Sequence, residues 1–117
     1  MIRVVVGDDQ PIMRWGVVTL LGTQPSALVV GEATDGLEAI ALTRALRPDV
    51  AVLDVSMPRC NGIRATSLLQ RVVPGLRVVL ISALGWPAMP DAARRAGAHR
   101  YVAKSAPAHE LLDAVFG

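Results

Sequence analysis

Cysteine and long hydrophobic runs are both scarce in this sequence. The single cysteine, Cys60, has no partner for an internal disulfide or a zinc cluster, which fits a reducing, cytoplasmic setting. Hydrophobic residues make up 52% of the chain, but no apolar run approaches the roughly 18 residues of a membrane span. The residues that follow Met1 also lack the layout of a signal peptide. We therefore expect a cytoplasmic protein that does not enter a membrane.

Lysine is almost absent as well. Of the 12 basic residues, Lys104 is the one lysine and all the others are arginine. The two are not interchangeable where a compact charge must fit a tight site. Lys104 is therefore a candidate functional residue, although a single lysine could also arise by chance. The formal net charge is only +2 and the arginines are scattered, which argues against nucleic-acid binding by this chain itself.

Apolar, β-branched runs alternate with helix-like segments along the 117 residues, a length that suits one compact domain. The expected strands cover residues 4–6, 28–33, 50–54, 77–81 and 101–103. The expected helices cover residues 11–21, 36–46, 62–72 and 89–96, and a last one follows residue 105. Strands and helices in strict alternation predict a parallel sheet with helices on both faces.

Local signals predict where some helices begin and which faces they bury. Asn61 is expected to cap the third helix and Ser105 the last one, because short polar side chains bind the free N–H groups of a first turn. In the second helix, Leu37, Ile40 and Ala41 are expected to share one face.

Polar residues stand where the apolar runs end. Asp8 and Asp9 follow the first run, Asp54 ends the third, Ser82 ends the fourth and Lys104 follows the fifth. The carboxyl ends of parallel strands share one edge of the sheet, and ligands bind at that edge. We therefore expect these five residues to meet in one cleft. Taken singly, Asp8 and Asp9 could be helix caps, and Asp54 and Ser82 could be turn residues.

The expected cleft suits phosphoryl chemistry. Two like charges about 4 Å apart repel by roughly 4 kcal/mol at an effective dielectric near 20, and Mg²⁺ relieves that cost where few carboxylates meet a phosphate oxygen. Lys104 could neutralise one phosphoryl oxygen and the Ser82 hydroxyl could donate to another. Asp54 would be the nucleophile, since carboxylates form aspartyl-phosphates.

At these residues the chain resembles the receiver domains of two-component response regulators, over essentially its whole length. The matching pieces are Val4–Asp9, Asp54–Pro58, Ile81–Ala83 and Ala96–Lys104. The resemblance implies the flavodoxin-like fold of chemotaxis Y-type proteins, with five parallel strands in the order 2-1-3-4-5 and five helices. It implies a phosphoacceptor switch rather than an enzyme, apart from self-phosphorylation from a phosphodonor and autodephosphorylation.

The resemblance also assigns the metal and phosphoacceptor roles. It makes Asp54 the acceptor of a phosphoryl group from a sensor histidine kinase. It makes Asp8, Asp9 and Asp54, with the backbone carbonyl of Ser56, the ligands of Mg²⁺ or Mn²⁺.

The remaining roles concern the phosphoryl group and its readout. The resemblance implies that Ser82, the Ala83 backbone N–H and Lys104 bind the phosphoryl group. Ser82 and Tyr101 resemble the pair whose inward shift reports phosphorylation to the surface of the protein.

Finer features resemble the NarL/FixJ (LuxR-type) subfamily. They are Asp9–Pro11 with Arg14–Gly16, Val30–Ala33, Leu46–Asp49 and Lys104–Ala106. Members of that subfamily are usually transcription regulators with a C-terminal helix-turn-helix domain. We expect such an output domain in the full-length protein, and DNA binding only through it, so that this chain is an excised receiver. A natural single-domain protein is the alternative.

Three departures from the pattern matter. Ser105 stands where many relatives have proline after the lysine, which puts the geometry of that peptide bond in question. Pro87 and Pro90 bracket the start of the fourth helix, so this helix is expected to start late. Trp15 and Val18, three residues apart on the first helix, stand where relatives tend to have polar residues. They are candidate contacts for a homodimer that forms on phosphorylation.

The sequence leaves one other function open and argues against two more. A receiver that docks or dimerises independently of phosphorylation remains an alternative. An aspartate-nucleophile phosphatase of the dehalogenase type needs a second aspartate two residues after the nucleophile, where this chain has Ser56. A flavodoxin should carry a hydroxyl-rich loop after its first strand, where this chain has Asp8 and Asp9.

Overall fold

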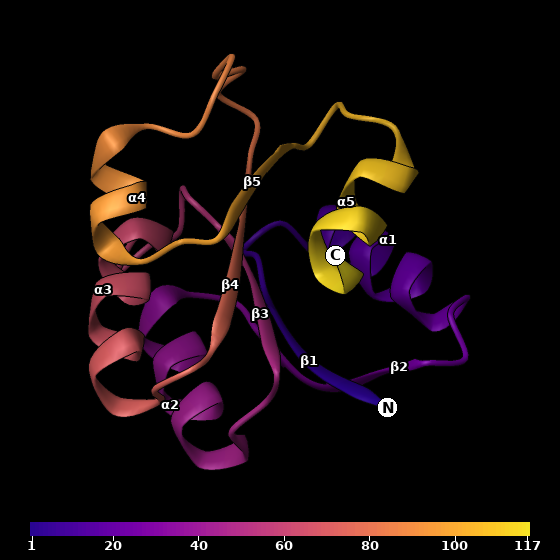
Figure 1. The fold of residues 1–117 in the computed structure, drawn as a ribbon, viewed down its shortest axis with the longest axis horizontal. Helices are drawn as coiled ribbons and strands as arrows, with labels where there is room; N and C mark the ends of the chain where they lie inside the picture. The colour runs from indigo at the N-terminus through magenta and orange to yellow at the C-terminus, as the bar shows by residue number, and fades with distance from the viewer.

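The computed structural model describes all residues from Met1 to Gly117 and shows five parallel strands alternating with five helices (Figure 1). The strands are β1 (Ile2–Gly7), β2 (Ala27–Ala33), β3 (Val50–Asp54), β4 (Arg77–Ser82) and β5 (Arg100–Ala103). The helices are α1 (Pro11–Gly22), α2 (Gly36–Leu46), α3 (Gly62–Val72), α4 (Asp91–Ala96) and α5 (Ala108–Phe116). The predicted alternation of elements is confirmed.

The sheet has the strand order β2-β1-β3-β4-β5, and every neighbouring pair is parallel. Helices α1 and α5 cover one face, and α2, α3 and α4 cover the other (Figure 1). The flavodoxin-like fold expected from the resemblance is therefore confirmed. No helix has both the length and the apolar character that crossing a bilayer requires.

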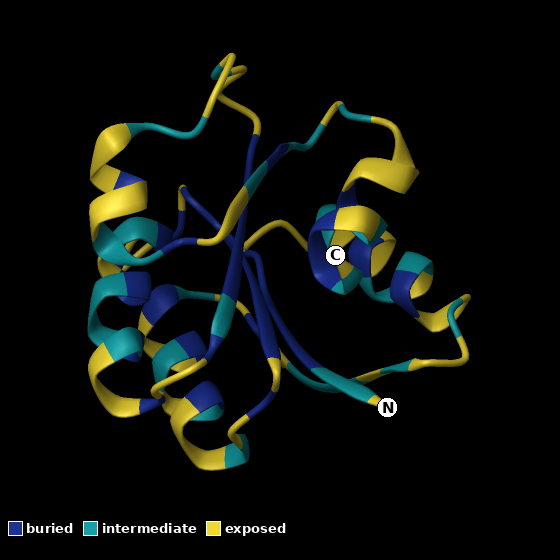
Figure 2. Ribbon diagram, in the orientation of Figure 1, coloured by how far each residue is buried: buried dark blue, intermediate teal, exposed yellow.

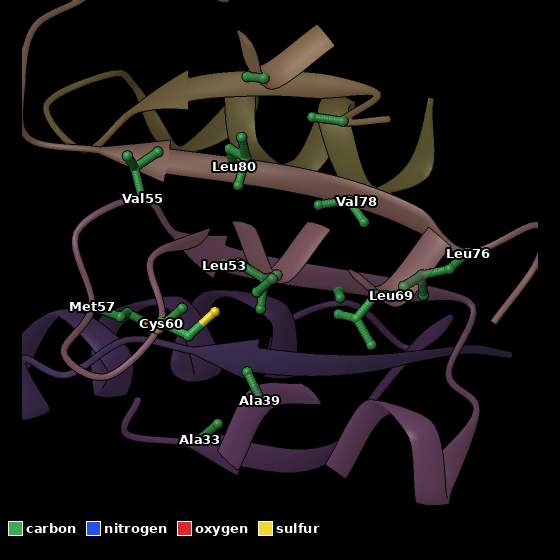
Figure 3. Packing of buried hydrophobic residues seen from close by; sticks show 14 of the residues in the cluster. Ala33, Ala39, Leu53, Val55, Met57, Cys60, Leu69, Leu76, Val78 and Leu80 are labelled. Atoms are coloured by element: carbon green, nitrogen blue, oxygen red, sulfur yellow. The ribbon is translucent and has the colours of Figure 1, made fainter. Parts of the chain in front are cut away.

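The central strands are buried on both sides, which is why they read as continuous apolar runs (Figure 2). Because side chains alternate along a strand, Leu53 and Leu80 enter the cluster under α2, α3 and α4, shown in Figure 3. Val52 and Ile81 enter the opposite cluster under α1 and α5. The two clusters fix β3 and β4 between two helix layers, and so fix the positions of the residues at the ends of these strands.

Two helix boundaries follow local chemistry. Asn61 caps α3 as predicted, since its side chain accepts a hydrogen bond from the Arg64 N–H at 2.9 Å. Helix α4 starts late, as the two prolines predicted. It begins only at Asp91, with Pro90 in the N-cap position, and Gly97 ends it with a φ of 102°. Helix α4 is therefore only six residues long.

The predicted cap of the last helix is wrong. Helix α5 begins at Ala108, Pro107 occupies the N-cap position, and no side chain caps the first turn. A proline disfavours the helical conformation in the residue before it, so Ala106 cannot join the helix and Ser105 lies too far upstream to act as a cap. The Lys104–Ser105 peptide bond is trans, since the chain contains no cis bond.

The predicted face of α2 is wrong in part. Ile40 packs against the core, but Leu37 is 46% exposed and Ala41 is also exposed. The buried positions are instead Gly36, Ala39 and Thr43. A Cβ atom at Gly36 would overlap the backbone carbonyl of Cys60. At Gly36 the start of α2 thus packs closely against the loop before α3, where a side chain has no room.

Candidate functional site

The polar residues predicted to meet do lie at the carboxyl edge of the sheet. Asp8 follows β1 directly, Asp54 is the last residue of β3 and Ser82 is the last residue of β4. Lys104 follows β5, and its backbone N–H donates to the Ser82 carbonyl at 2.8 Å. The parallel registers of β1, β3, β4 and β5 bring residues up to 96 positions apart in sequence together at this edge.

Three carboxylates gather there. One oxygen each from Asp8, Asp9 and Asp54 can be chosen so that all lie within 4.8 Å of one another. Asp8 and Asp54 are buried, at 0% and 3% exposed, whereas Asp9 is open to solvent. Carboxylate oxygens at this spacing, with one side open, are the donor set that a hard divalent cation such as Mg²⁺ takes.

Lys104 faces the two buried carboxylates. Its Nζ donates to Asp54 Oδ2 at 2.9 Å and lies 3.0 Å from Asp8 Oδ2. It also donates to Gln10 Oε1 at 3.1 Å. The ammonium is therefore held between β1 and β3 although it belongs to the end of β5.

The charges do not balance. Asp8, Asp9 and Asp54 with Lys104 leave two negative charges uncompensated, which equals the charge that one Mg²⁺ supplies. Burial raises the pKa of Asp54 above 3.8; the hydrogen bond from Lys104 opposes this shift and the nearby charge of Asp8 adds to it. Burial alone would lower the pKa of Lys104, but its contacts with Asp54 and Asp8 outweigh that effect and raise its pKa above 10.5, so Lys104 stays charged.

Backbone N–H groups hold the other oxygens of these carboxylates. Asp8 Oδ1 accepts from the Gln10 N–H at 2.9 Å, and Asp54 Oδ1 accepts from the Ser56 N–H at 3.1 Å. Each aspartate thereby keeps its second oxygen toward Lys104. The two hydrogen bonds hold Asp54 in one orientation before any ligand arrives.

Ser82 and Ala83 add donors beside the carboxylates. Ser82 is buried, and its Oγ accepts from the Leu84 N–H at 2.9 Å, while its own proton has no acceptor in the protein. The Ala83 N–H donates no hydrogen bond within the chain and this residue is exposed. Both groups are free to donate to an anion at the sheet edge.

Tyr101 lies on β5 and is only partly buried, yet its hydroxyl is buried without a hydrogen-bond partner. Its ring packs on Trp86, with ring centroids 5.5 Å apart and an interplanar angle of 47°. A buried unpaired hydroxyl costs about 1–3 kcal/mol, and a conformation that gave the Tyr101 hydroxyl a partner would remove that cost.

Trp15 and Val18 are not equally exposed. Trp15 is 67% exposed on α1, whereas Val18 is partly buried against the α1–α5 side of the core. The large apolar neighbour of Trp15 at the surface is instead Ile12, which is 79% exposed. The three-residue spacing of Ile12 and Trp15 was a signal for this pair in the sequence.

Sequence reasoning missed the roles of two residues. Gln10 was noted only as part of a motif, but it supplies the third oxygen around the Lys104 ammonium. Trp86 was given no role, but its ring contacts Tyr101. The signal for Gln10 was its position directly after Asp8 and Asp9, since a polar side chain there can reach the same edge.

The chain is similar to known proteins over nearly its whole length. A model of the response regulator receiver domain matches residues 4–116. The DNA-binding transcriptional activator DevR/DosR of Mycobacterium tuberculosis is 46% identical over 116 residues, which cover 98% of this chain and 53% of that protein. The chain spans about half the length of the curated relatives it matches.

Solved structures show the same fold. The signal receiver domain of the response regulator NarL from M. tuberculosis superimposes with a TM-score of 0.92 at 42% identity, covering 98% of this chain and 93% of that one. CheY of Borrelia burgdorferi, solved in a complex with CheX, BeF₃ and Mg²⁺, gives a TM-score of 0.86 at 26% identity, covering 98% of this chain and 87% of that one.

Proposed function

We propose that a sensor histidine kinase phosphorylates this chain on Asp54, because the chain belongs to the response-regulator receiver family and is a receiver of the NarL type. The observation that carries the proposal is the buried contact of Asp54 with Lys104, 2.9 Å apart, beside two further carboxylates. The transfer takes place in the cytoplasm and makes the domain a phosphoacceptor switch rather than a conventional enzyme.

In the proposed reaction a carboxylate oxygen of Asp54 attacks the phosphorus of the donor. A bond forms between that oxygen and phosphorus, and the bond between phosphorus and the donor breaks. The electron pair of the broken bond stays with the donor, which is the imidazole of a phosphohistidine or the carboxylate of acetyl phosphate. The Ser56 N–H holds one oxygen of Asp54 in place, which orients the carboxylate for attack.

Asp8, Asp9 and Asp54, with the Ser56 carbonyl, would hold Mg²⁺ or Mn²⁺. The close grouping of three carboxylate oxygens and the deficit of two positive charges support this assignment. When bound, the metal supplies charge neutralisation for the phosphoryl oxygens.

The remaining phosphoryl oxygens would be bound by Lys104, Ser82 and the Ala83 N–H. Lys104 is charged and already points at Asp54. The Ser82 proton and the Ala83 N–H have no partner in the protein. Charge-assisted hydrogen bonds to these three donors would neutralise the product where the charge develops.

The switch would pass from Ser82 to Tyr101. To bind the phosphoryl group, the Ser82 hydroxyl would turn toward Asp54, and Tyr101 would move with its unpaired hydroxyl. Trp86 packs on Tyr101, so its surroundings would change at the same step. A phosphoryl group drives this shift only by its differential contacts with the two states.

The output would be self-association and, through a C-terminal helix-turn-helix domain, DNA binding. Trp15 is 67% exposed at the surface of α1, and we propose that it makes the central contact of a homodimer formed on phosphorylation, with Val18 at the edge of that contact. The DNA-binding role named for DevR/DosR of M. tuberculosis supports a regulator of transcription.

Beryllofluoride with Mg²⁺ tests the proposal against a receiver that docks independently of phosphorylation. In a Trp15→Phe background, Trp86 is the only tryptophan. We expect its fluorescence to change on adding beryllofluoride and Mg²⁺, together with the amide NMR shifts of Asp54, Ser82 and Ala83. The Asp54→Asn variant should show neither change. Unchanged shifts in the wild type would favour the docking module.

A further inference from the structure

A second cleft lies between α3 and α4, which pack side by side (Figure 1), and it adjoins the carboxylates at Val55 and Ser56. Its volume is about 740 Å³, which lies within the range of about 300–1,000 Å³ that small-molecule sites occupy. The residues that line it are Val55, Ser56, Asn61, Ile63, Arg64, Ser67, Trp86, Ala92, Arg95 and Ala96.

The cleft exists because α4 is short and its inner positions are small. Helix α4 begins only at Asp91, and the loop before it contributes Trp86 to the lining of the cleft. Ala92 and Ala96 line the α4 wall, and Ser67 lines the α3 wall. Side chains of this size leave the space between the two helices open.

The charge of the cleft is positive. Arg64 and Arg95 line it from opposite walls, and neither guanidinium takes part in any ion pair or hydrogen bond of the protein. None of the lining residues is acidic. The neighbouring Arg94 differs, since Asp91 binds it at 2.6 Å and it does not line the cleft. Two unpaired guanidiniums with no carboxylate suit a phosphate, which the planar fork of arginine binds with two hydrogen bonds.

The other walls add an aromatic surface and hydrogen-bond donors. Trp86 lines the cleft, and its packing on Tyr101 restrains the indole ring. The side-chain oxygen of Asn61 is occupied by the Arg64 N–H, which leaves its amide N–H groups free to donate. An aromatic face beside donors and cations matches a ligand with a planar ring and a phosphate.

We propose that the α3–α4 cleft binds a small organic phosphate with a planar ring, of the nucleotide class. Its phosphates lie between Arg64 and Arg95, and its ring lies against Trp86. None of the three clustered carboxylates lines this cleft, although Ser56 borders both sites. The proposal does not depend on phosphorylation of Asp54.

The test is a titration of the ¹⁵N-labelled chain with ADP in EDTA, followed by amide NMR shifts. We expect saturable shifts at Ser67, Ala92 and Ala96. Arg64→Gln and Arg95→Gln should each weaken ADP binding by about tenfold or more, while the matched control Arg94→Gln should leave it unchanged. Adenosine and pyrophosphate should each bind more weakly than ADP, because each lacks half of the ligand. Both arginines are exposed, and the amide spectra verify that the variants fold.

Three results would overturn the proposal. The first is ADP binding that is absent or equal in the wild type and both arginine variants. The second is binding whose shifts map to Asp54 and that disappears in Lys104→Met, which would place the ligand at the phosphoacceptor. The third is tighter binding of a blocked hexaglutamate peptide than of ADP, with the same dependence on Arg64 and Arg95, which would assign the cleft to an acidic protein partner.

Discussion

The Lys104 ammonium lies 2.9 Å from a carboxylate oxygen of Asp54, and both side chains are buried, at 8% and 4% exposed. Asp8 shares the same ammonium at 3.0 Å. Removing one partner of a buried ion pair leaves the other charge without compensation, which costs about 3 kcal/mol or more. Lys104 therefore stabilises the carboxyl edge of the sheet and also keeps a cation ready beside the proposed phosphoacceptor.

The Lys104→Met variant should lose about 3 kcal/mol of unfolding free energy in EDTA. Mg²⁺ should restore more stability to this variant than to the wild type, because the charge deficit of the carboxylates grows when the ammonium is lost. Urea denaturation with and without Mg²⁺ measures both effects. Arg71→Met, at an exposed residue without an ion pair, is the control and should change stability by less than about 0.5 kcal/mol. Equal stabilities for the two variants would contradict the role of the ion pair.

The contribution of Asp54 to stability should depend on pH in a defined direction. Burial, which the hydrogen bond from Lys104 offsets only in part, raises the pKa of Asp54 above 3.8. Just above pH 3.8 the native protein thus binds more protons than the unfolded chain, and the contribution of Asp54 falls as the pH rises through its native pKa.

Asparagine does not titrate, so the difference in unfolding free energy should shift in favour of Asp54→Asn as the pH rises through that window. Urea denaturation of both proteins in EDTA at a series of pH values measures this difference. A difference that stays constant, or that shifts toward the wild type with rising pH, would show that Asp54 is not destabilised by its burial.

Mg²⁺ should stabilise the fold through the three carboxylates. At a concentration of 100 times Kd, a ligand that binds only the native state adds about 2.7 kcal/mol to the unfolding free energy. Asp9 is exposed, so Asp9→Asn should fold normally but show little rise in Tm with Mg²⁺. Asp113→Asn, at an exposed position on α5, should keep the full rise. A Tm rise in Asp9→Asn equal to that of Asp113→Asn would remove Asp9 from the metal site.

The proposed dimer depends on the exposed tryptophan of α1. With beryllofluoride and Mg²⁺, we expect the wild type to dimerise and Trp15→Glu to weaken the dimer by at least about tenfold, because a charge replaces a large buried aromatic contact. Leu37→Glu changes an apolar residue that is 46% exposed on the opposite face of the sheet, and it should have no effect. Sedimentation velocity compares the three proteins. A dimerisation constant in Trp15→Glu that matches the wild type would refute this contact.

The sheet and most of the site could be predicted from the sequence because both depend on short-range patterns. Strands buried on two faces appear as continuous apolar runs, and β3 ends at Asp54 as such a run predicts. The polar residue that ends or follows each run must then lie on the same edge of a parallel sheet. That geometry brought Asp8, Asp54 and Lys104 together within ion-pair distance.

What the sequence could not reveal depends on tertiary geometry. Gln10 follows β1 and Lys104 follows β5, and these strands are separated in the sheet by β3 and β4. Their side chains can meet only because all these parallel strands end at the same edge of the sheet. The contact of Trp86 with Tyr101 depends on the path of the loop after β4. The face of α2 was misjudged because its buried positions hold the small residues Gly36, Ala39 and Thr43 rather than large apolar ones.

Intact mass spectrometry after treatment with acetyl phosphate tests the central claim, that Asp54 is the phosphoacceptor. The wild type should gain one phosphoryl group in the presence of Mg²⁺ and none in EDTA, and Asp54→Asn should gain none under either condition. An adduct of the same size in Asp54→Asn, or no adduct in the folded, Mg²⁺-loaded wild type, would contradict the account.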